Sequence, residues 1–128
     1  MPIEALVARL VDAGFIDDQA FAAARSASLS RRGYGAHRVG LALRAAGIEP
    51  EDSADALENA TESQWRAGEA FAKRRRIGPF AADAGDRDQR RKAMAAMLRA
   101  GHPGHVARAF AFAEPGVSPI PEEDDEPN

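Results

Sequence analysis

Apolar residues recur along this sequence at the three- and four-residue spacing of amphipathic helices. The clearest apolar stripe lies between residues 36 and 46 and consists of Val39, Ala42, Leu43 and Ala46. Polar and basic side chains fill the other positions of that segment, so the stripe would face a core and the opposite side would face solvent. No stretch alternates apolar and polar residues as a half-buried strand does. The pattern predicts an all-α protein.

Glycines mark the expected ends of the helices. Gly47 suits the left-handed position that closes a helix, and Ile48 can then fold back onto Leu43, as in a Schellman ending. The same ending recurs at Gly14 and Gly101, each preceded by an apolar residue four positions earlier. The repetition indicates degenerate copies of one helical unit.

Caps and helix breakers set the other boundaries. Thr61 with Gln64, and Asp86 with Gln89, have the spacing of capping boxes, which open helices. A Gly-Pro pair cannot continue a helix, so residues 77–85 are expected to form a loop. We therefore expect helices over residues 2–13, 18–30, 36–46, 50–59, 61–76, 86–100 and 103–113.

The apolar stripes also predict which side chains form the core. Phe80, in the expected loop, should dock on that core. Burial against neighbouring helices supplies most of the stability of such amphipathic helices. The expected inward-facing residues are Phe21, Ala24, Leu29, Trp65, Gly68, Phe71, Ala72, Met94, Met97, Leu98, Val106, Ala109, Phe110 and Ala113.

The composition narrows the class of protein. With 128 residues, the chain has room for one compact domain or a short array of repeats. It contains no Cys, which excludes disulfides and thiolate metal sites. No apolar run reaches the length of a membrane span, and the N-terminus lacks the pattern of a signal peptide. We expect a cytoplasmic protein with no membrane association. The absence of Cys is compatible with the reducing cytoplasm.

The net charge of −3 conceals an asymmetry along the chain. Residues 114–128 hold six acids and no base, and the rest of the chain carries 17 bases against 14 acids. The folded part is therefore mildly basic, and the proline-rich acidic end is expected to be a disordered tail. So small an excess of bases does not by itself indicate nucleic-acid binding, for which clustering matters more.

No set of residues has the arrangement of a catalytic or metal site. Asp17 and Asp18 could in principle perform acid–base chemistry, but they are placed as helix caps, which is the favoured interpretation. His102 and His105 could share a metal, yet neither Cys nor acid lies nearby, so a polar helix start is favoured. The residues therefore show no catalytic constellation, and we expect no cofactor.

Basic residues gather in three groups beside the expected helix ends. One such group would be explained by a solvated surface, but three favour a binding surface, and the planar arginine fork pairs with carboxylate or phosphate. Tyr34 lies between Gly33 and Gly35 and is either a buried loop anchor, which is favoured, or an exposed contact. The candidate partner-binding residues are Arg31, Arg32, Tyr34, Arg38, Arg44, Arg74, Arg75, Arg76, Arg90, Arg91 and Lys92.

Several of these stretches resemble the RecX family, regulatory proteins that modulate the recombinase RecA. The resemblance covers roughly residues 3–113. The middle-repeat motif of the family matches Arg31, Arg32, Tyr34, Gly35 and Arg38, and its preceding junction matches Gly14, Asp17, Asp18 and Phe21. The matching stretches are residues 14–22 (GFIDDQAFA), 31–39 (RRGYGAHRV) and 43–48 (LRAAGI), and more loosely 90–92 (RRK) and 98–101 (LRAG).

The resemblance implies tandem three-helix repeats that form an elongated, curved helical array. Such a protein, expected to be a monomer, would lie in the groove of the RecA–DNA filament and contact RecA, with DNA as the second candidate partner, during DNA repair, recombination and the SOS response. It would not be an enzyme, and it would restrain filament extension, ATP hydrolysis and strand exchange. Residues 1–15 would be the last helix of an incomplete first repeat, 16–60 the second repeat, 61–113 the third, and 114–128 the tail.

The chain departs from the family pattern in a few places. It lacks the first two helices of the first repeat. His102 stands where an aromatic residue usually follows the third glycine, and Ala100 stands where a second Arg is common, which weakens the expectation that the last repeat packs or binds as usual. The acidic tail has no assigned counterpart.

Two other functions remain open from the sequence. A direct DNA-binding protein would use the basic turn and helix that carry Arg31, Arg32, Arg38 and Arg44. An interaction scaffold for an unrelated partner would need only the helical repetition.

Overall fold

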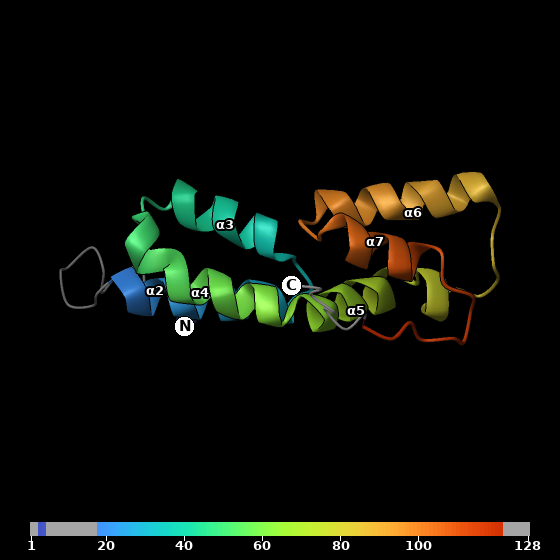
Figure 1. The fold of residues 1–128 in the computed structure, drawn as a ribbon, viewed down its shortest axis with the longest axis horizontal. Coiled ribbons are helices and arrows are strands. Elements are labelled where there is room, and N and C mark those ends of the chain that lie inside the picture. The colour runs from blue at the N-terminus through green and yellow to red at the C-terminus, as the bar shows by residue number, and fades with distance from the viewer. Residues whose placement is uncertain (1–2, 5–17, 122–128) are drawn as a thin grey trace, which may run out of the picture.

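The computed structural model describes residues 3, 4 and 18–121, and helices are the only regular secondary structure in that part of the chain. The prediction of an all-α protein is therefore confirmed. The molecule is elongated, with two groups of helices placed end to end (Figure 1). Its elements are α2 (Asp18–Arg31), α3 (Ala36–Ala45), α4 (Pro50–Glu62), α5 (Gln64–Arg75), the 3-10 turn η1 (Gly78–Phe80), α6 (Arg87–Arg99) and α7 (Gly104–Ala111).

Each group of helices encloses its own apolar core. Helices α2, α3 and α4 form what we call the first unit, and α5, α6 and α7 form the second unit. The core of the first unit consists of Ala22, Leu29, Val39, Leu43, Ile48, Ala56 and Ala60. The core of the second unit consists of Phe71, Ala72, Ile77, Met97, Ala100, Val106, Ala107, Phe110 and Ala111.

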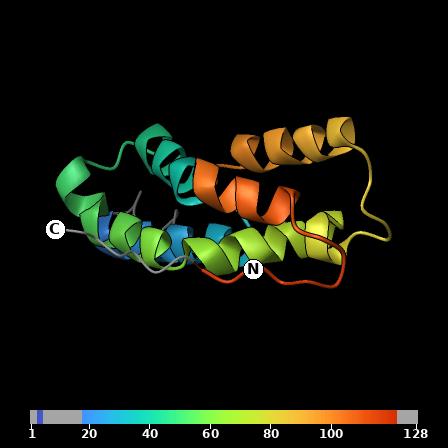
Figure 2. The same cartoon turned by 45° about the vertical axis from the view of Figure 1, so that its right-hand side comes forward.

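The two units meet where α4 passes into α5. These helices follow one another with Ser63 alone between them, and they run on in nearly one line in both ribbon views (Figure 2). The prediction of a capping box at Thr61 is wrong, because α4 continues to Glu62 and the Thr61 hydroxyl donates to the carbonyl of Leu57 one turn back. No glycine or proline lies there to stop the helix earlier.

Three of the described helices end in the Schellman pattern at a glycine, two of them as predicted, and α5 makes the same pair of bonds at Arg76 (φ 55°). At Gly47 (φ 80°), its N–H donates to Arg44 O at 3.0 Å, and Ile48 N–H donates to Leu43 O at 3.1 Å. The ending at Gly101 (φ 97°) makes the equivalent pair of bonds. Gly33 (φ 92°) closes α2 in the same way, so each unit contributes such an ending to the junction. Gly14 lies outside the described residues.

The capping box predicted for α6 is present. The Asp86 carboxylate accepts from Gln89 N–H, and the Gln89 side chain accepts from Asp86 N–H, both at 2.8 Å. The loop of residues 77–85 contains one short turn, η1, and Phe80 packs partly buried against the core of the second unit as expected. Local sequence chemistry therefore fixes this end of the molecule.

The predicted core differs from the observed one on α6 and α7 and at Ala46, which was expected on the inward stripe but is exposed at the end of α3. Leu98 was expected inside but is 44% exposed, because α6 turns the preceding Met97 fully inward and adjacent helix positions point about 100° apart. On α7, Ala107 and Ala111 are buried. Ala109 and Ala113, which were expected inside, are only partly covered. None of the helices in the described ranges has the length and apolar character needed to cross a membrane.

The start of the segment expected to be a disordered tail makes specific contacts. Gly116 N–H donates to Pro79 O at 2.9 Å, and the Glu114 carboxylate pairs with Arg90 at 3.2 Å. Residues 114–121 run back along α5 in both ribbon views. The expectation of disorder from residue 114 is therefore corrected for this part, and residues 122–128, like most of residues 1–15 and the expected cap Asp17, lie outside the described residues.

Candidate functional site

The two units are joined by a direct contact between their glycine-containing loops. Gly35 N–H donates to Ala100 O at 2.9 Å, and His37 N–H donates to Gly101 O at 3.2 Å. The approach is so close that a Cβ atom on Gly35 would lie 2.3 Å from the Gly101 carbonyl carbon. Only glycine permits two backbones to meet in this way, so these loops fix the relative position of the units.

His102 extends this contact into the interior. Its side chain is only 3% exposed, its Nε2 lies 2.8 Å from Gly33 O, and its ring packs against Phe71 with centroids 5.6 Å apart. Because Gly33 O can only accept, Nε2 carries the proton and donates. Burial lowers the pKa of His102, and the bond to Gly33 opposes that shift. The interpretation of His102 as a polar helix start is thus wrong, since it is a buried residue of the junction.

Tyr34 lies where the two cores meet. It is partly buried and packs against the apolar cluster of each unit, as the loop-anchor interpretation expects. Two arginines also lie over its ring. The guanidinium carbon of Arg38 is 4.9 Å from the ring centroid, and that of Arg32 is 5.5 Å from it. Tyr34 therefore both seals the junction and orients cations around it.

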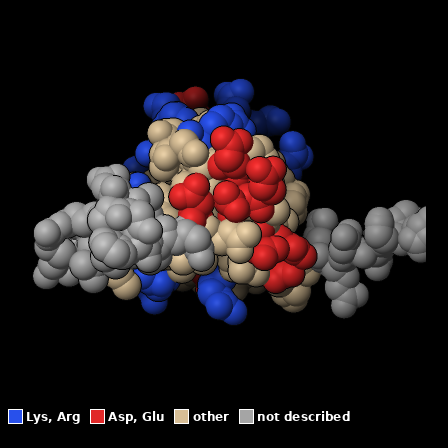
Figure 3. All heavy atoms as spheres, turned by 90° about the vertical axis from the view of Figure 1, so that its left-hand side faces the viewer, with Lys and Arg blue, Asp and Glu red and all other residues tan. Residues whose placement is uncertain are grey.

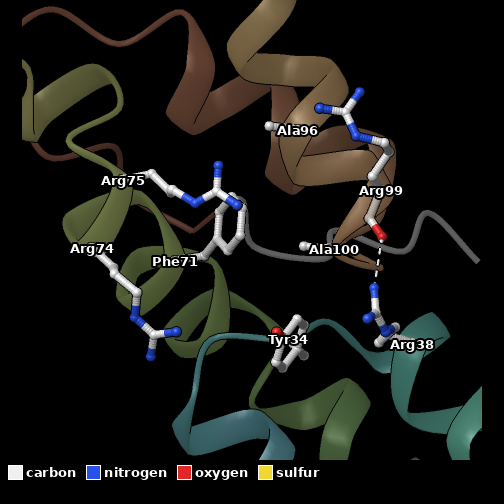
Figure 4. A pocket seen from close by; sticks show the side chains of 8 residues that line it. All are labelled: Tyr34, Arg38, Phe71, Arg74, Arg75, Ala96, Arg99 and Ala100. Carbon is white, nitrogen blue, oxygen red and sulfur yellow. Dashed lines mark hydrogen bonds between the residues drawn. The ribbon is translucent and has the colours of Figure 1, made fainter.

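A hollow of about 330 Å³ opens beside this junction, and we call it the inter-unit groove (Figure 4). It takes arginines from three helices: one from α3, two from α5 and one from α6. Arg75 packs over the Phe71 ring at 5.1 Å, and Arg38 donates to the backbone carbonyl of Arg99 at 3.4 Å. The residues that line the groove are Tyr34, Arg38, Phe71, Arg74, Arg75, Ala96, Arg99 and Ala100.

The charges of the groove are not neutralised by the described part of the chain. None of its lining residues is acidic. The ion pairs found among the described residues join Arg25 to Glu4, Arg90 to Glu114 and Lys92 to Asp88, and thus involve no groove arginine. Four cations around one concave surface produce a local positive potential, which low-dielectric walls strengthen. The arrangement can bind anions.

The groove gathers only some of the residues that the sequence singled out. It unites Tyr34, Arg38, Arg74 and Arg75, and Arg32 lies over the Tyr34 ring. Arg31 is exposed at the end of α2. The others lie elsewhere: Arg44 lines a separate hollow between α3 and α4, Arg76 ends α5 near Arg90, and Arg91 and Lys92 are exposed on α6.

Arg90 has a structural position rather than a free one. Its guanidinium donates to Ala84 O at 3.1 Å and to Phe112 O at 3.2 Å, and it also pairs with Glu114. It therefore ties the segment after α7 to the start of α6.

Sequence reasoning missed Arg99 as a site residue. The signal that could have revealed it is its place in the last turn before Gly101, because a helix that ends at a docking glycine delivers its last side chains to the junction.

Charge is also unevenly distributed along the length of the molecule. Acidic side chains gather at the end of the first unit that lies away from the groove (Figure 3). Helix α4 begins there, with Glu51 and Asp52 in its first turn, where negative charge complements the helix dipole. The basic groove and the acidic end are thus separated along the long axis.

No group of three or more His, Asp or Glu side chains that could hold a metal ion exists within residues 3, 4 and 18–121.

Comparison with known proteins relates the chain to one family. Residues 17–57 match the family model of the second three-helix domain of RecX. The chain is 34% identical over 116 residues to the regulatory protein RecX of Myxococcus xanthus (strain DK1622), which covers 88% of this chain and 62% of that protein. No solved structure matches. The chain thus spans somewhat less than two thirds of this relative, and these matches together support its assignment to the RecX family of regulatory proteins.

Proposed function

We propose that this protein regulates the RecA system by binding the RecA filament and restraining its ATP hydrolysis, its extension and strand exchange. Similarity to the RecX family supports this proposal, since the matched relative is a regulatory protein of that name. The protein would act as a cytoplasmic monomer without catalysis of its own.

The observation that carries the proposal is the inter-unit groove. A filament of protein and nucleic acid offers carboxylates and phosphates, and both are ligands for the planar arginine fork. Arg38, Arg75 and Arg99 come from both units, so a partner held in the groove would engage the first and second units together. An elongated array of helices that binds its partner at a rigid junction has a shape that can follow a filament.

The test is the ATP turnover of RecA on single-stranded DNA. Adding the protein should lower turnover in a saturable manner. The double variant Arg75→Ala, Arg99→Ala should require a higher concentration for the same effect. The variant Arg66→Ala, Arg108→Ala removes the same charge from exposed positions outside the groove and should act like the wild type. Unchanged turnover at a concentration where the protein cosediments with the filament would refute inhibition of the ATPase.

A second candidate is direct binding to DNA. The observation that favours it is that Arg31, Arg32 and Arg38 lie near one another at the turn between α2 and α3, as a basic turn and helix requires, although Arg44 belongs to another hollow. Its signature is affinity for naked duplex DNA whose logarithm falls with the logarithm of salt concentration by about 0.9 per phosphate contacted. Affinity too weak to titrate at low salt would remove this candidate.

A further inference from the structure

We infer that the inter-unit groove is a phosphate-binding site that holds at least two neighbouring phosphate groups of one ligand. The inference uses the same site as the proposed function but concerns binding by this chain alone, without RecA. Three features carry it: the number of arginines that line the hollow, the sides from which they approach, and the aromatic rings and backbone bonds that hold them in place.

The number of cations sets the charge of the ligand. Four arginines line about 330 Å³, and no carboxylate lines that space. A single carboxylate would leave most of this charge uncompensated, whereas adjacent phosphates bring several negative charges into a small volume. The groove therefore fits a ligand with closely spaced phosphates.

The directions of approach distinguish phosphate from carboxylate. Arg38, Arg75 and Arg99 come from three different helices and reach the hollow from different sides. A tetrahedral phosphate presents oxygens in several directions, and a carboxylate presents its two oxygens in one plane. Forks that lie on several sides of one hollow can each find an acceptor on neighbouring phosphates, which favours this chemistry over an acidic peptide.

The aromatic residues of the groove support arginines instead of receiving bases. Phe71 is only 5% exposed, and Arg75 covers its ring, so no base can stack there. Tyr34 is covered by Arg32 and Arg38. The site would therefore recognise phosphates and be indifferent to the identity of the bases, because contacts to phosphate carry no direct sequence information.

The walls of the groove are held in place before any ligand arrives. The backbone bonds of Gly35 to Ala100 and of His37 to Gly101 join the loop that carries Tyr34 to the end of α6 that carries Arg99. A preformed site loses less conformational entropy on binding than a flexible one. Two sources of adjacent phosphates share this chemistry, namely the backbone of a single nucleic-acid strand and the polyphosphate chain of a free nucleotide.

The experiment measures fluorescence anisotropy of a labelled oligothymidylate of about 16 nucleotides with the full chain at low salt. Inorganic tripolyphosphate and ATP are titrated as competitors, and they are also titrated directly by calorimetry. A polyglutamate peptide of the same total charge is the carboxylate control. The groove variant Arg75→Ala, Arg99→Ala is compared with Arg66→Ala, Arg108→Ala, with helicity checked by circular dichroism, and Arg75→Gln, Arg99→Gln replaces the alanine variant if its helicity falls.

Binding of at least one phosphate probe should be lost in the groove variant and kept in the control variant. If the oligonucleotide binds, the slope of its salt dependence should fall by about 1.4 in the groove variant, about 0.7 for each phosphate contact removed from a single strand. Binding of the oligonucleotide identifies a strand as the source, and binding of tripolyphosphate or ATP alone identifies a free polyphosphate.

Three results would overturn the inference: no phosphate probe binds at low salt, both double variants weaken binding equally, or polyglutamate competes as well as the oligonucleotide. Because RecA is absent, any of these results leaves the ATP turnover test of the proposed function unaffected. Lowered turnover without phosphate binding would mean that the groove contacts protein.

Discussion

His102 Nε2 lies 2.8 Å from the carbonyl oxygen of Gly33, a residue 69 positions earlier in the chain. The bond links the glycine that closes α2 to the residue that follows the glycine closing α6. Each unit thus uses its own helix ending as a docking surface for the other. Nδ1 of His102 is buried and has no hydrogen-bond partner in the described part of the chain, so a second proton there would find no acceptor.

Lowering the pH should therefore destabilise the junction. The folded pKa of His102 is depressed below its ordinary value of 6.5 by burial, so the unfolded chain binds the proton more readily. The stabilisation is complete above about pH 6.5 and is lost as the pH falls through the folded pKa. The melting temperature should drop between about pH 7.5 and about pH 5.5, and His102→Gln should show a smaller drop. Equal slopes for the two proteins would contradict a neutral buried imidazole.

Gly35→Ala should be strongly destabilising. The added methyl group would lie 2.3 Å from the Gly101 carbonyl group, which is backbone and cannot turn aside. The two loops must separate, at a cost of about 1–3 kcal/mol in the free energy of unfolding, measured by urea denaturation. Gly104→Ala is the matched control, since a Cβ there meets nothing within 4 Å at the first position of α7. If both variants were equally stable, the close contact of the loops would be refuted.

Gly47→Val should destabilise the first unit for a different reason. Gly47 has a φ of 80° and open space around it, so the penalty comes from backbone strain alone. We expect a loss of about 1–2 kcal/mol, with a smaller loss for Gly47→Asn, because asparagine tolerates the left-handed region better. Thermal unfolding followed by circular dichroism measures both, and an unchanged melting temperature for the valine variant would refute the helix ending.

Arg90→Ala should loosen the segment that follows α7. The variant removes the bonds to Ala84 O and Phe112 O and the ion pair with Glu114. Limited proteolysis should cut faster after Phe112, and the free energy of unfolding should fall by about 1 kcal/mol. Arg91→Ala, which changes an exposed neighbour, should leave the cleavage rate as it is. Identical digestion of the two variants would show that Arg90 does not hold the segment.

The features predicted correctly from the sequence depend on neighbours within one turn of a helix. The endings at Gly47 and Gly101 and the capping box of Asp86 and Gln89 each need only a few adjacent residues. Where local signals conflicted, the prediction failed: the capping spacing at Thr61 was outweighed by an uninterrupted helix up to Glu62. Leu98 was misplaced because neighbouring apolar residues on one helix cannot all face one core.

The sequence by itself determined the helices, their endings and the presence of clustered arginines, because helix periodicity, caps and glycine endings are short-range properties. Only the tertiary structure decided which arginines act together. Arg38, Arg75 and Arg99 are brought to one groove by the docking of loops more than 60 residues apart, while Arg44 and Arg90, equally basic in sequence, are placed elsewhere. The physical reason is that such long-range contacts depend on two backbones meeting at Gly35 and Gly101, a complementarity that no local pattern encodes.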